Sequence, residues 1–427
     1  GTPARVLTSS IDFSKTSLEE GSKRFIRFSE DTKEDEVRSV AEQMPCYLTY
    51  TTEKTKEIVL ANLNKSSMYS GVVKGVGPRY CPSFEDKIVR FSDKERHQLF
   101  LEPLDATNEL TYVQGFSTSM PYDVQEEMVH SVIGLENCEI VKYAYAIEYD
   151  AIDPLQVKAS LEMKDIDGLF IGGQILGTSG YEEAAGLGMM AGINALRKLN
   201  NKEPLVLKRD EAYIGVMIDD LVTKGTNEPY RLLTSRAEYR LLMRHDNAEN
   251  RLIKYGHENG LISEERYQRY LSKQDQMSSL VTYLKNSKVD YSTGIGEYLN
   301  SLGFKEDDMK SFNAYELVKR PGVECSEVLK FLNNDSYDDE VVFNTQIEIR
   351  YQGYIQKARK EADKMLKMDG MKLPQDIDYS KVDNLRLEAR QKLNQVKPFT
   401  LGQASRISGI NPADLNVLAV YIKEHKI

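Results

Sequence analysis

A glycine-rich segment at residues 167–186 constrains the possible fold more than any other part of the chain. The apolar run at 169–171 predicts a short buried strand. A helix is expected to begin near Tyr181, with Ala184, Gly188 and Gly192 along one bare face. Its N-terminus presents free N–H groups that suit a phosphate or an electron-rich planar ring. A tight strand–helix connection without a ligand is the alternative. The glycines that permit positive φ and close backbone approach are Gly172, Gly173, Gly177 and Gly180.

The regions on either side of this segment differ in pattern. Residues 1 to about 155 contain stretches typical of strands at 46–52, 88–91, 97–101 and 110–113. From about residue 205 the pattern is helical, and helices are expected over 267–285, 347–368 and 382–396. The sequence therefore predicts an α+β or α/β core with a mostly β domain, followed by an all-helical C-terminal domain.

The end of the chain carries clear helix-start signals. Thr400 and Gln403 have the spacing of a capping box. Asn411 and Pro412 fit the N-cap and first position of a last helix. These signals predict a compact helical end domain, with a nucleic-acid-binding helix-turn-helix as the alternative.

Composition excludes several classes of protein. The 427 residues include 56 Lys and Arg against 66 Asp and Glu, a formal net charge of −10. Any nucleic-acid binding must therefore use a local basic patch. The four cysteines lack CxxC spacing, which argues against a zinc ribbon or a disulfide scaffold, and no metal site is predicted. No apolar run approaches the roughly 20 residues of a membrane span. We expect a cytoplasmic protein that does not span a membrane.

A loop around residues 75–87 is a candidate reactive site. It contains Cys81, with Arg79 and Lys87 nearby in the sequence. Cationic neighbours lower the pKa of a thiol and favour a nucleophilic cysteine. Cys46 lies at a predicted turn-to-strand edge. A buried, inert thiol is the alternative for any cysteine and the expectation for Cys138 and Cys325.

Residues 223–254 carry a net charge of +3 within this acidic chain. If one helix holds throughout, the arginines Arg236, Arg240, Arg244 and Arg251 fall within one sector at about 100° per residue. Such a stripe can follow a phosphate backbone. The alternative is a solvated helix face with ion pairs four residues apart.

Four long motifs resemble those of the MnmG/GidA family of flavoproteins, which modify tRNA uridine with a 5-carboxymethylaminomethyl group. The tail motif at 404–409 extends the resemblance, which covers essentially the whole chain. One part of the family pattern, the N-terminal Rossmann G-x-G-x-x-G half, is absent, so the chain is expected to be the C-terminal part of such a protein. The motifs lie at 45–47, 78–87, 173–185 and 230–240.

This resemblance implies a function for the chain. It implies addition of a carboxymethylaminomethyl or aminomethyl group at C5 of the wobble uridine, U34. FAD would mediate the redox step, NADH would reduce it, and methylenetetrahydrofolate would be a substrate. It implies tRNA and the GTPase MnmE as partners, with a homodimer that joins MnmE in a heterotetramer.

The resemblance also implies site residues and domain limits. Cys81 and Cys46 correspond to cysteines implicated in catalysis. The Gly-rich loop would contact FAD through Gln174, Gly173, Gly177, Gly180, Tyr181, Glu182 and Glu183. The segment assigned to NAD comprises Gly77, Pro78, Arg79, Tyr80, Pro82, Ser83, Phe84, Glu85, Asp86, Lys87, Ile88, Val89, Arg90 and Phe91. The expected tRNA contacts are Arg231, Arg236, Arg240, Arg244 and Arg251. The expected domains are an inserted β-rich domain with part of the core at 1–150, the second half of the FAD-binding domain at 151–203, a helical tRNA-binding region at 204–340, and a helical domain for the GTPase and tRNA at 341–427.

Two other functions stay open from the sequence. One is a folate- and FAD-dependent tRNA uridine methyltransferase, a relative that shares only the core, so the long helical part after residue 205 argues against it. The other is a non-catalytic module that binds tRNA or a partner. Bound flavin would separate the enzyme from such a module.

Overall fold

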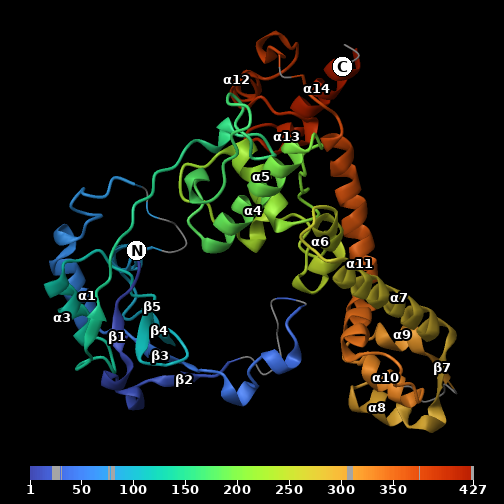
Figure 1. The fold of residues 1–427 in the computed structure, drawn as a ribbon, viewed down its shortest axis with the longest axis horizontal. Helices are drawn as coiled ribbons and strands as arrows, with labels where there is room; N and C mark the ends of the chain where they lie inside the picture. Colours follow the sequence, from blue (N-terminus) through green and yellow to red (C-terminus); the bar gives the residue numbers. More distant parts are fainter. Residues whose placement is uncertain are drawn as a thin grey trace. The chain divides into compact units, whose positions relative to one another are not determined.

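The computed structural model describes residues 1–424 except 22–28, 30, 76, 78–81, 305–310 and 375. Contacts within the chain divide it into two compact units. Figure 1 colours the chain along its sequence, from blue at the N-terminus to red at the C-terminus. The first consists of Gly1–Ala151 with Asn227–Arg231, and the second of Ile152–Thr226 with Leu232–Ile427. Among the described residues, no helix is long and apolar enough to cross a membrane.

The first unit is built on an antiparallel sheet whose strand order is β2-β3-β4-β5-β1-β6. Three helices pack with it: α1 (Glu53–Ala61), α2 (Phe84–Arg90) and α3 (Tyr122–His130). The strands predicted at 46–52, 97–101 and 110–113 are confirmed. The strands are β1 (Arg5–Leu7), β2 (Ser17–Glu19), β3 (Cys46–Tyr50), β4 (Gln98–Pro103), β5 (Leu110–Gln114) and β6 (Ile140–Lys142).

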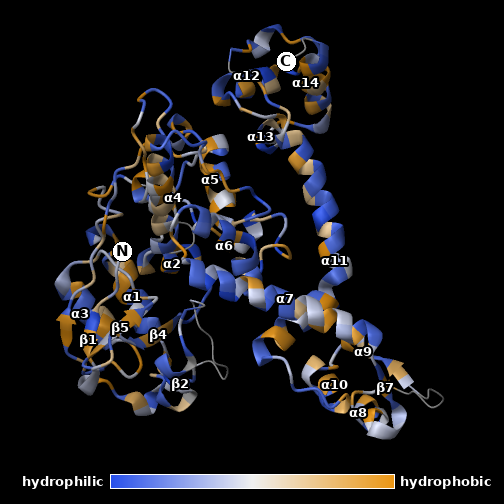
Figure 2. Cartoon of the chain, turned by 45° about the vertical axis from the view of Figure 1, so that its right-hand side comes forward, coloured by the Kyte–Doolittle hydropathy of each residue, from blue (hydrophilic) through white to orange (hydrophobic). Residues whose placement is uncertain are grey.

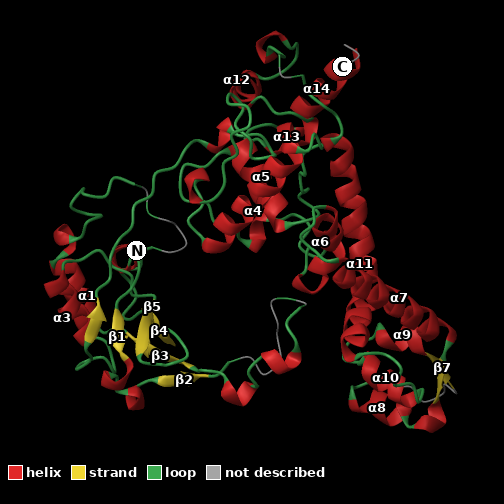
Figure 3. Cartoon of the chain, viewed as in Figure 1, coloured by secondary structure: helices red, strands yellow, loops and turns green. Residues whose placement is uncertain are grey.

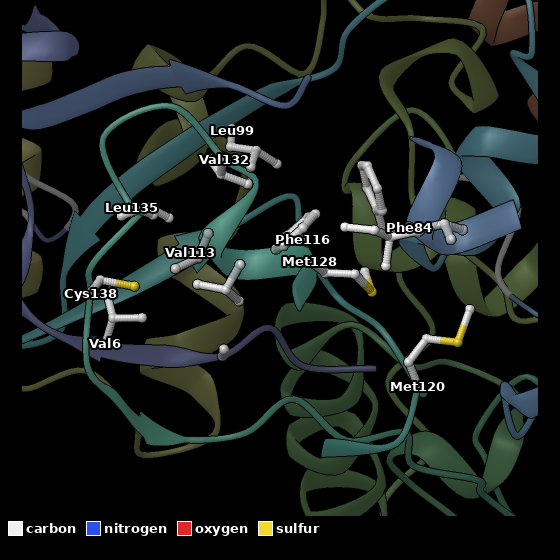
Figure 4. Close-up of a cluster of buried hydrophobic side chains, with 14 of the residues drawn as sticks. Val6, Phe84, Leu99, Val113, Phe116, Met120, Met128, Val132, Leu135 and Cys138 are labelled. Atoms are coloured by element: carbon white, nitrogen blue, oxygen red, sulfur yellow. The ribbon is translucent and has the colours of Figure 1, made fainter. Parts of the chain in front are cut away.

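The core of this unit forms because alternate strand residues face the helices. Leu99 and Leu101 of β4 and Val113 of β5 are buried, and they meet Phe84 of α2 and Met128 of α3. Figure 4 shows Leu99, Val113, Phe84 and Met128 in one cluster, with Cys138 at one end of it. The sheet therefore fixes the position of α2, which follows the candidate reactive loop.

The strand expected at 88–91 is wrong, because these residues lie in and just after α2. The Ser83 hydroxyl caps this helix by accepting a hydrogen bond from the Asp86 N–H at 3.3 Å. Phe84 and Ile88, four residues apart, are buried, whereas Val89 is exposed. The serine cap and the four-residue apolar spacing outweigh the strand propensity of the apolar run.

The second unit contains the Gly-rich segment, and the helix expected near Tyr181 is confirmed as α4 (Tyr181–Leu199). The buried strand expected at 169–171 is wrong. Phe170 makes only an isolated bridge with Glu162, and Leu169 is exposed. Three apolar residues do not form a strand where the described residues offer no strand ladder beside them.

The single helix assumed for residues 223–254 is also wrong. Helix α5 (Tyr213–Lys224) ends before Gly225, and α6 (Ala248–Glu258) starts more than 20 residues later. Short 3-10 turns at Thr234–Arg236 and His245–Asn247 lie between them. Because Pro229 and the glycine after α5 interrupt the helix, the arginines of this region do not share one helical face.

The remainder of the second unit is helical, as predicted (Figure 3), and its described residues include one small strand pair, β7 (Lys288–Asp290) with β8 (Ser311–Asn313). The expected N-caps are confirmed: Thr400 accepts from the Gln403 N–H at 3.1 Å, and Asn411 accepts from the Asp414 N–H at 3.0 Å. The return bond of the capping box differs, because the Gln403 side chain accepts from the Phe399 N–H at 2.7 Å. The helices are α7 (Glu264–Asn286), α8 (Ile295–Ser301), α9 (Ala314–Val318), α10 (Cys325–Phe331), α11 (Asp339–Asp369), α12 (Leu387–Val396), α13 (Leu401–Arg406) and α14 (Pro412–Glu424).

Candidate functional site

The turn before α4 lies directly against that helix. A Cβ atom at Gly172 would lie 2.9 Å from the Cα of Gly188, so only glycine permits this approach. Gly173 and Gly177 have φ angles of 87° and 85°, which other residues rarely adopt. The sequence therefore folds this turn for close backbone contact.

The N-terminus of α4 faces outward without a side-chain cap. Gly180 occupies the cap position, and the Ala184 N–H is the first to bond back to the Gly180 carbonyl. The N–H groups of the first turn therefore have no partner within the helix. Tyr181 beside them is 87% exposed, and the buried Gln174 Oε1 has no hydrogen-bond partner. An electron-rich ring or a phosphate fits these N–H donors, whereas the Gln174 oxygen can accept a hydrogen bond from a donor on the ligand.

Glu183, expected at the cofactor, has a structural contact. Its side chain is buried, and Oε1 accepts a hydrogen bond from the Leu232 N–H at 2.9 Å. The carboxylate thus ties the first turn of α4 to the segment after α5. Glu182, in contrast, is exposed.

The loop at 77–91 is described only in part. Pro78, Arg79, Tyr80 and Cys81 lie outside the described residues, whereas Gly77 and the residues from Pro82 onward are described.

The first turn of α2, after this loop, is anchored by polar contacts. The fully buried Glu85 accepts hydrogen bonds from the Ser66 hydroxyl and the Ser119 N–H, both at 3.0 Å, while its Oε2 has no partner. Asp86 accepts from the Tyr69 hydroxyl at 2.9 Å. Burial, followed by this hydrogen bond, raises the pKa of Tyr69 to about 12. These carboxylates hold α2 to the rest of the first unit.

The described cysteines have thiols that favour the protonated form. Cys46 is half-buried at the start of β3, and burial together with Glu102 and Glu19 raises the pKa of its thiol. Cys138 and Cys325 are buried, and burial raises the pKa of each thiol to about 12. The expectation that the latter two are inert core residues is confirmed.

Four of the five candidate tRNA-binding arginines have partners inside the protein, and among them Arg236 lies 3.9 Å from Asp220. Arg244 Nε donates to Asp246 at 3.0 Å, and Arg244 Nη2 lies 2.5 Å from Glu348. Arg251 donates to Asn247 at 2.9 Å and to the Arg244 carbonyl at 3.0 Å. Arg240 is exposed, whereas Arg231 and Arg236 are half-buried. Arg240 is thus the exposed member of the candidate stripe, whereas the other four arginines are half-buried and interact with other groups of the protein.

A buried charge network that the sequence did not indicate lies beside this region. Arg209 donates to Asp220 at 2.8 Å, to Asp219 at 3.1 Å and to Glu238 at 2.8 Å. Arg406 of α13 lies 2.7 Å from Asp219. These partners are up to 187 residues apart in the chain, so no local pattern could have predicted the network.

Family comparisons give an independent view of the chain. Residues 1–203 match the family described as Glucose inhibited division protein A. Residues 264–359 and 361–427 match the C-terminal helical domain and the C-terminal helical bundle of the tRNA modifying enzyme MnmG/GidA. The chain belongs to the MnmG/GidA family. This confirms the resemblance drawn from the motifs and the expected fold of a core followed by helical domains.

Individual relatives of the MnmG/GidA family match nearly all of the chain. A tRNA uridine 5-carboxymethylaminomethyl modification enzyme MnmG of Listeria innocua is 52% identical over 429 residues, covering 100% of this chain and 67% of the relative. The enzyme of the same name from Streptococcus mutans is 50% identical, covering 99% and 67%. The crystal structure of Aquifex aeolicus GidA matches with a TM-score of 0.85 and 43% identity, covering 99% and 66%. The chain thus spans about two thirds of the length of these MnmG/GidA proteins.

The two helical regions of the MnmG/GidA family meet inside one helix of this chain. The boundary between residues 359 and 361 falls within α11 (Asp339–Asp369). The domain limits expected at 150, 203 and 340 remain a prediction.

Proposed function

We propose that the protein takes part in modification of the tRNA wobble uridine U34, adding a carboxymethylaminomethyl or aminomethyl group at C5. The observation that carries this proposal is the likeness to MnmG enzymes at 50–52% identity along essentially the whole chain. The Gly-rich turn before α4 supports it, because the turn leads into a helix N-terminus that has no side-chain cap and can bind an electron-rich ligand group.

The turn residues fit part of an FAD site. The partnerless Gln174 Oε1 and the uncapped N-terminus of α4 supply polar groups, and a Cβ atom at Gly173 would meet nothing within 4 Å, which leaves space beside the turn. FAD supplies the redox step of this chemistry when it is bound, with NADH as reductant. We place NADH at the segment 77–91, and methylenetetrahydrofolate enters as a substrate.

The cysteines supply the covalent chemistry of the proposal. Addition of a Cys81 thiolate to C6 of the uridine would make C5 nucleophilic. Cys46, whose pKa is raised by burial and two carboxylates, is suited to hold a proton at neutral pH. We therefore assign the nucleophile to Cys81 and a proton-donating role to Cys46.

The proposal includes partners and a location. Arg240, which is exposed, contacts tRNA phosphates, together with the half-buried Arg231 and Arg236, which also have partners inside the protein. The protein works as a cytoplasmic homodimer together with the GTPase MnmE. The methyltransferase alternative is disfavoured because the helical regions at 264–359 and 361–427 match MnmG/GidA domains.

The test is modified-nucleoside analysis of tRNA from cells that lack the gene and carry a full-length copy with Cys81→Ser. We expect loss of the C5 modification while the protein level is maintained. Cys138→Ala is the matched control, because it removes a buried thiol distant in sequence from the loop and should retain modification. Normal modification in the Cys81→Ser strain would remove the nucleophilic role. Normal modification in the deletion strain would refute the function itself.

A further inference from the structure

The second half of α11 carries a line of lysines on one side. At about 100° per residue, Lys357, Lys360, Lys364 and Lys367 fall within a sector of roughly 80°. All four are exposed. They extend over about 15 Å along the helix axis. We call these four residues the lysine stripe, and Figure 2 shows this part of α11 as largely hydrophilic.

The opposite side of this half-helix is the one that packs. Ala362, opposite the centre of the lysine stripe, is 1% exposed. Met365 contacts Ser405 of α13 at 3.9 Å, and Asp369 lies 3.1 Å from Arg406. Packing against α13 thus fixes the orientation of the helix, and the lysine stripe faces away from it.

The lysine stripe lacks carboxylate partners within the part of the chain that the structure describes. None of its four ammonium groups lies within 4.0 Å of an acidic oxygen there. By contrast, Lys158 and Lys198 both pair with Glu162. Residues 350–368 contain six basic and two acidic side chains in a chain of net charge −10. The two acidic residues are Glu361 and Asp363, so the net charge of this segment is positive.

Packing within the protein does not explain the residue types at two positions beside the lysine stripe, Gly353 and Tyr354. Gly353 lies in the same sector one turn earlier, and a Cβ atom there would meet nothing within 4 Å. Glycine within a helix lowers the stability of the helix relative to alanine. At Gly353 no close packing contact requires a glycine. Tyr354 next to it is 69% exposed. A small residue and an exposed aromatic ring allow a sugar–phosphate backbone to approach closely and a base to stack.

We propose that the lysine stripe, with Gly353 and Tyr354, binds the backbone of the tRNA substrate. The proposal rests on the proposed function and names the residues of α11 that would contact tRNA within the helical region expected at 341–427. A polyanion explains the unpaired lysines, since an acidic protein must concentrate its positive charge to bind RNA. The exposed Tyr354 favours RNA over an acidic protein surface as the partner, because an RNA base can stack on the tyrosine ring.

The test compares two triple variants for binding to an unmodified tRNA transcript between 50 and 200 mM salt. One variant is Lys357→Gln with Lys360→Gln and Lys364→Gln. The control, Lys65→Gln with Lys94→Gln and Lys202→Gln, makes the same charge change at scattered exposed lysines. We expect the stripe variant to flatten the slope of log affinity against log salt by about 2 to 3 units. The ratio of wild-type to variant affinity should then be about 30-fold larger at 50 mM than at 200 mM.

The outcomes separate this inference from the function on which it rests. If the wild-type protein does not bind the transcript, the proposed function fails. If wild type binds and both triple variants keep its salt slope, or both lose it equally, the lysine stripe is not the tRNA surface. Loss of binding to poly-glutamate with an unchanged tRNA slope would assign the stripe to an acidic protein partner and overturn the proposal.

Gly353→Ala gives a second test in which folding and binding change in opposite directions. We expect a higher urea midpoint, because alanine favours the helix, together with tRNA affinity reduced severalfold. A higher midpoint with unchanged affinity would remove Gly353 from the surface.

Discussion

Arg209 and Lys360 belong to the same unit, yet their charges have opposite surroundings. Arg209 is 7% exposed and meets three carboxylates, of which Asp220 is 2% exposed. Lys360 is exposed, and no carboxylate within the described residues pairs with it. The first charge joins α5 to neighbouring segments, whereas the second is available to an outside anion. Basic residues that are equivalent in a charge count therefore differ in what they do.

The difference follows from the chemistry of the two side chains. A guanidinium can donate several hydrogen bonds in a fixed plane, and Arg209 uses them on Asp219, Asp220 and Glu238. A lysine on an exposed helix face keeps its ammonium hydrated and mobile, which suits contact with phosphates at varied positions. The predictions below test this division.

The largest effect is expected from Arg209→Leu. The substitution removes one partner of the buried Asp220 and leaves Lys224 at 2.7 Å, and breaking a buried pair costs up to about 3–5 kcal/mol. Urea unfolding should show this loss, whereas Lys360→Gln should stay within about 0.5 kcal/mol of wild type. A loss below about 1 kcal/mol for Arg209→Leu would mean that the network does not stabilise the unit.

A smaller effect with a defined pH dependence is expected at Glu162. Its hydrogen bonds with Lys198 and the Gly168 N–H, followed by Lys158, lower its pKa to about 2 from the usual 4.5. A lowered folded-state pKa means that the stabilisation is present above pH 4.5 and is lost as the pH falls towards 2. The difference in unfolding free energy between wild type and Glu162→Gln should therefore shrink across that window. A difference that is constant between pH 6 and 2.5 would contradict the pairing.

Local signals in the sequence predicted much of the fold. The Thr400 and Asn411 caps, the helix from Tyr181 and three strands of the first unit follow from residues that act on their neighbours. Residues 88–91 were misassigned because their strand propensity hid the Ser83 cap. The run at 169–171 lacks a neighbouring strand ladder within the described residues.

The candidate site was less predictable, because its contacts join distant parts of the chain. The four-residue spacing of Arg240 and Arg244 predicts one helical face, but these two residues lie in a segment of turns and not in a helix. Arg244 meets Glu348, 104 residues away, which no spacing rule indicates. The partnerless Gln174 oxygen and the unpaired lysine stripe likewise become visible only when burial and partners are known.

The most direct test of this division measures two properties of two single variants, Arg244→Gln and Lys360→Gln. For each, urea unfolding gives the free energy of unfolding, and titration with a tRNA transcript gives the salt slope. The account predicts that Arg244→Gln loses about 1.5–3 kcal/mol of stability and keeps the wild-type slope. It predicts that Lys360→Gln keeps its stability and flattens the slope by about 0.7–0.9. A flattened slope for Arg244→Gln with full stability, or a destabilised Lys360→Gln with an unchanged slope, would contradict it.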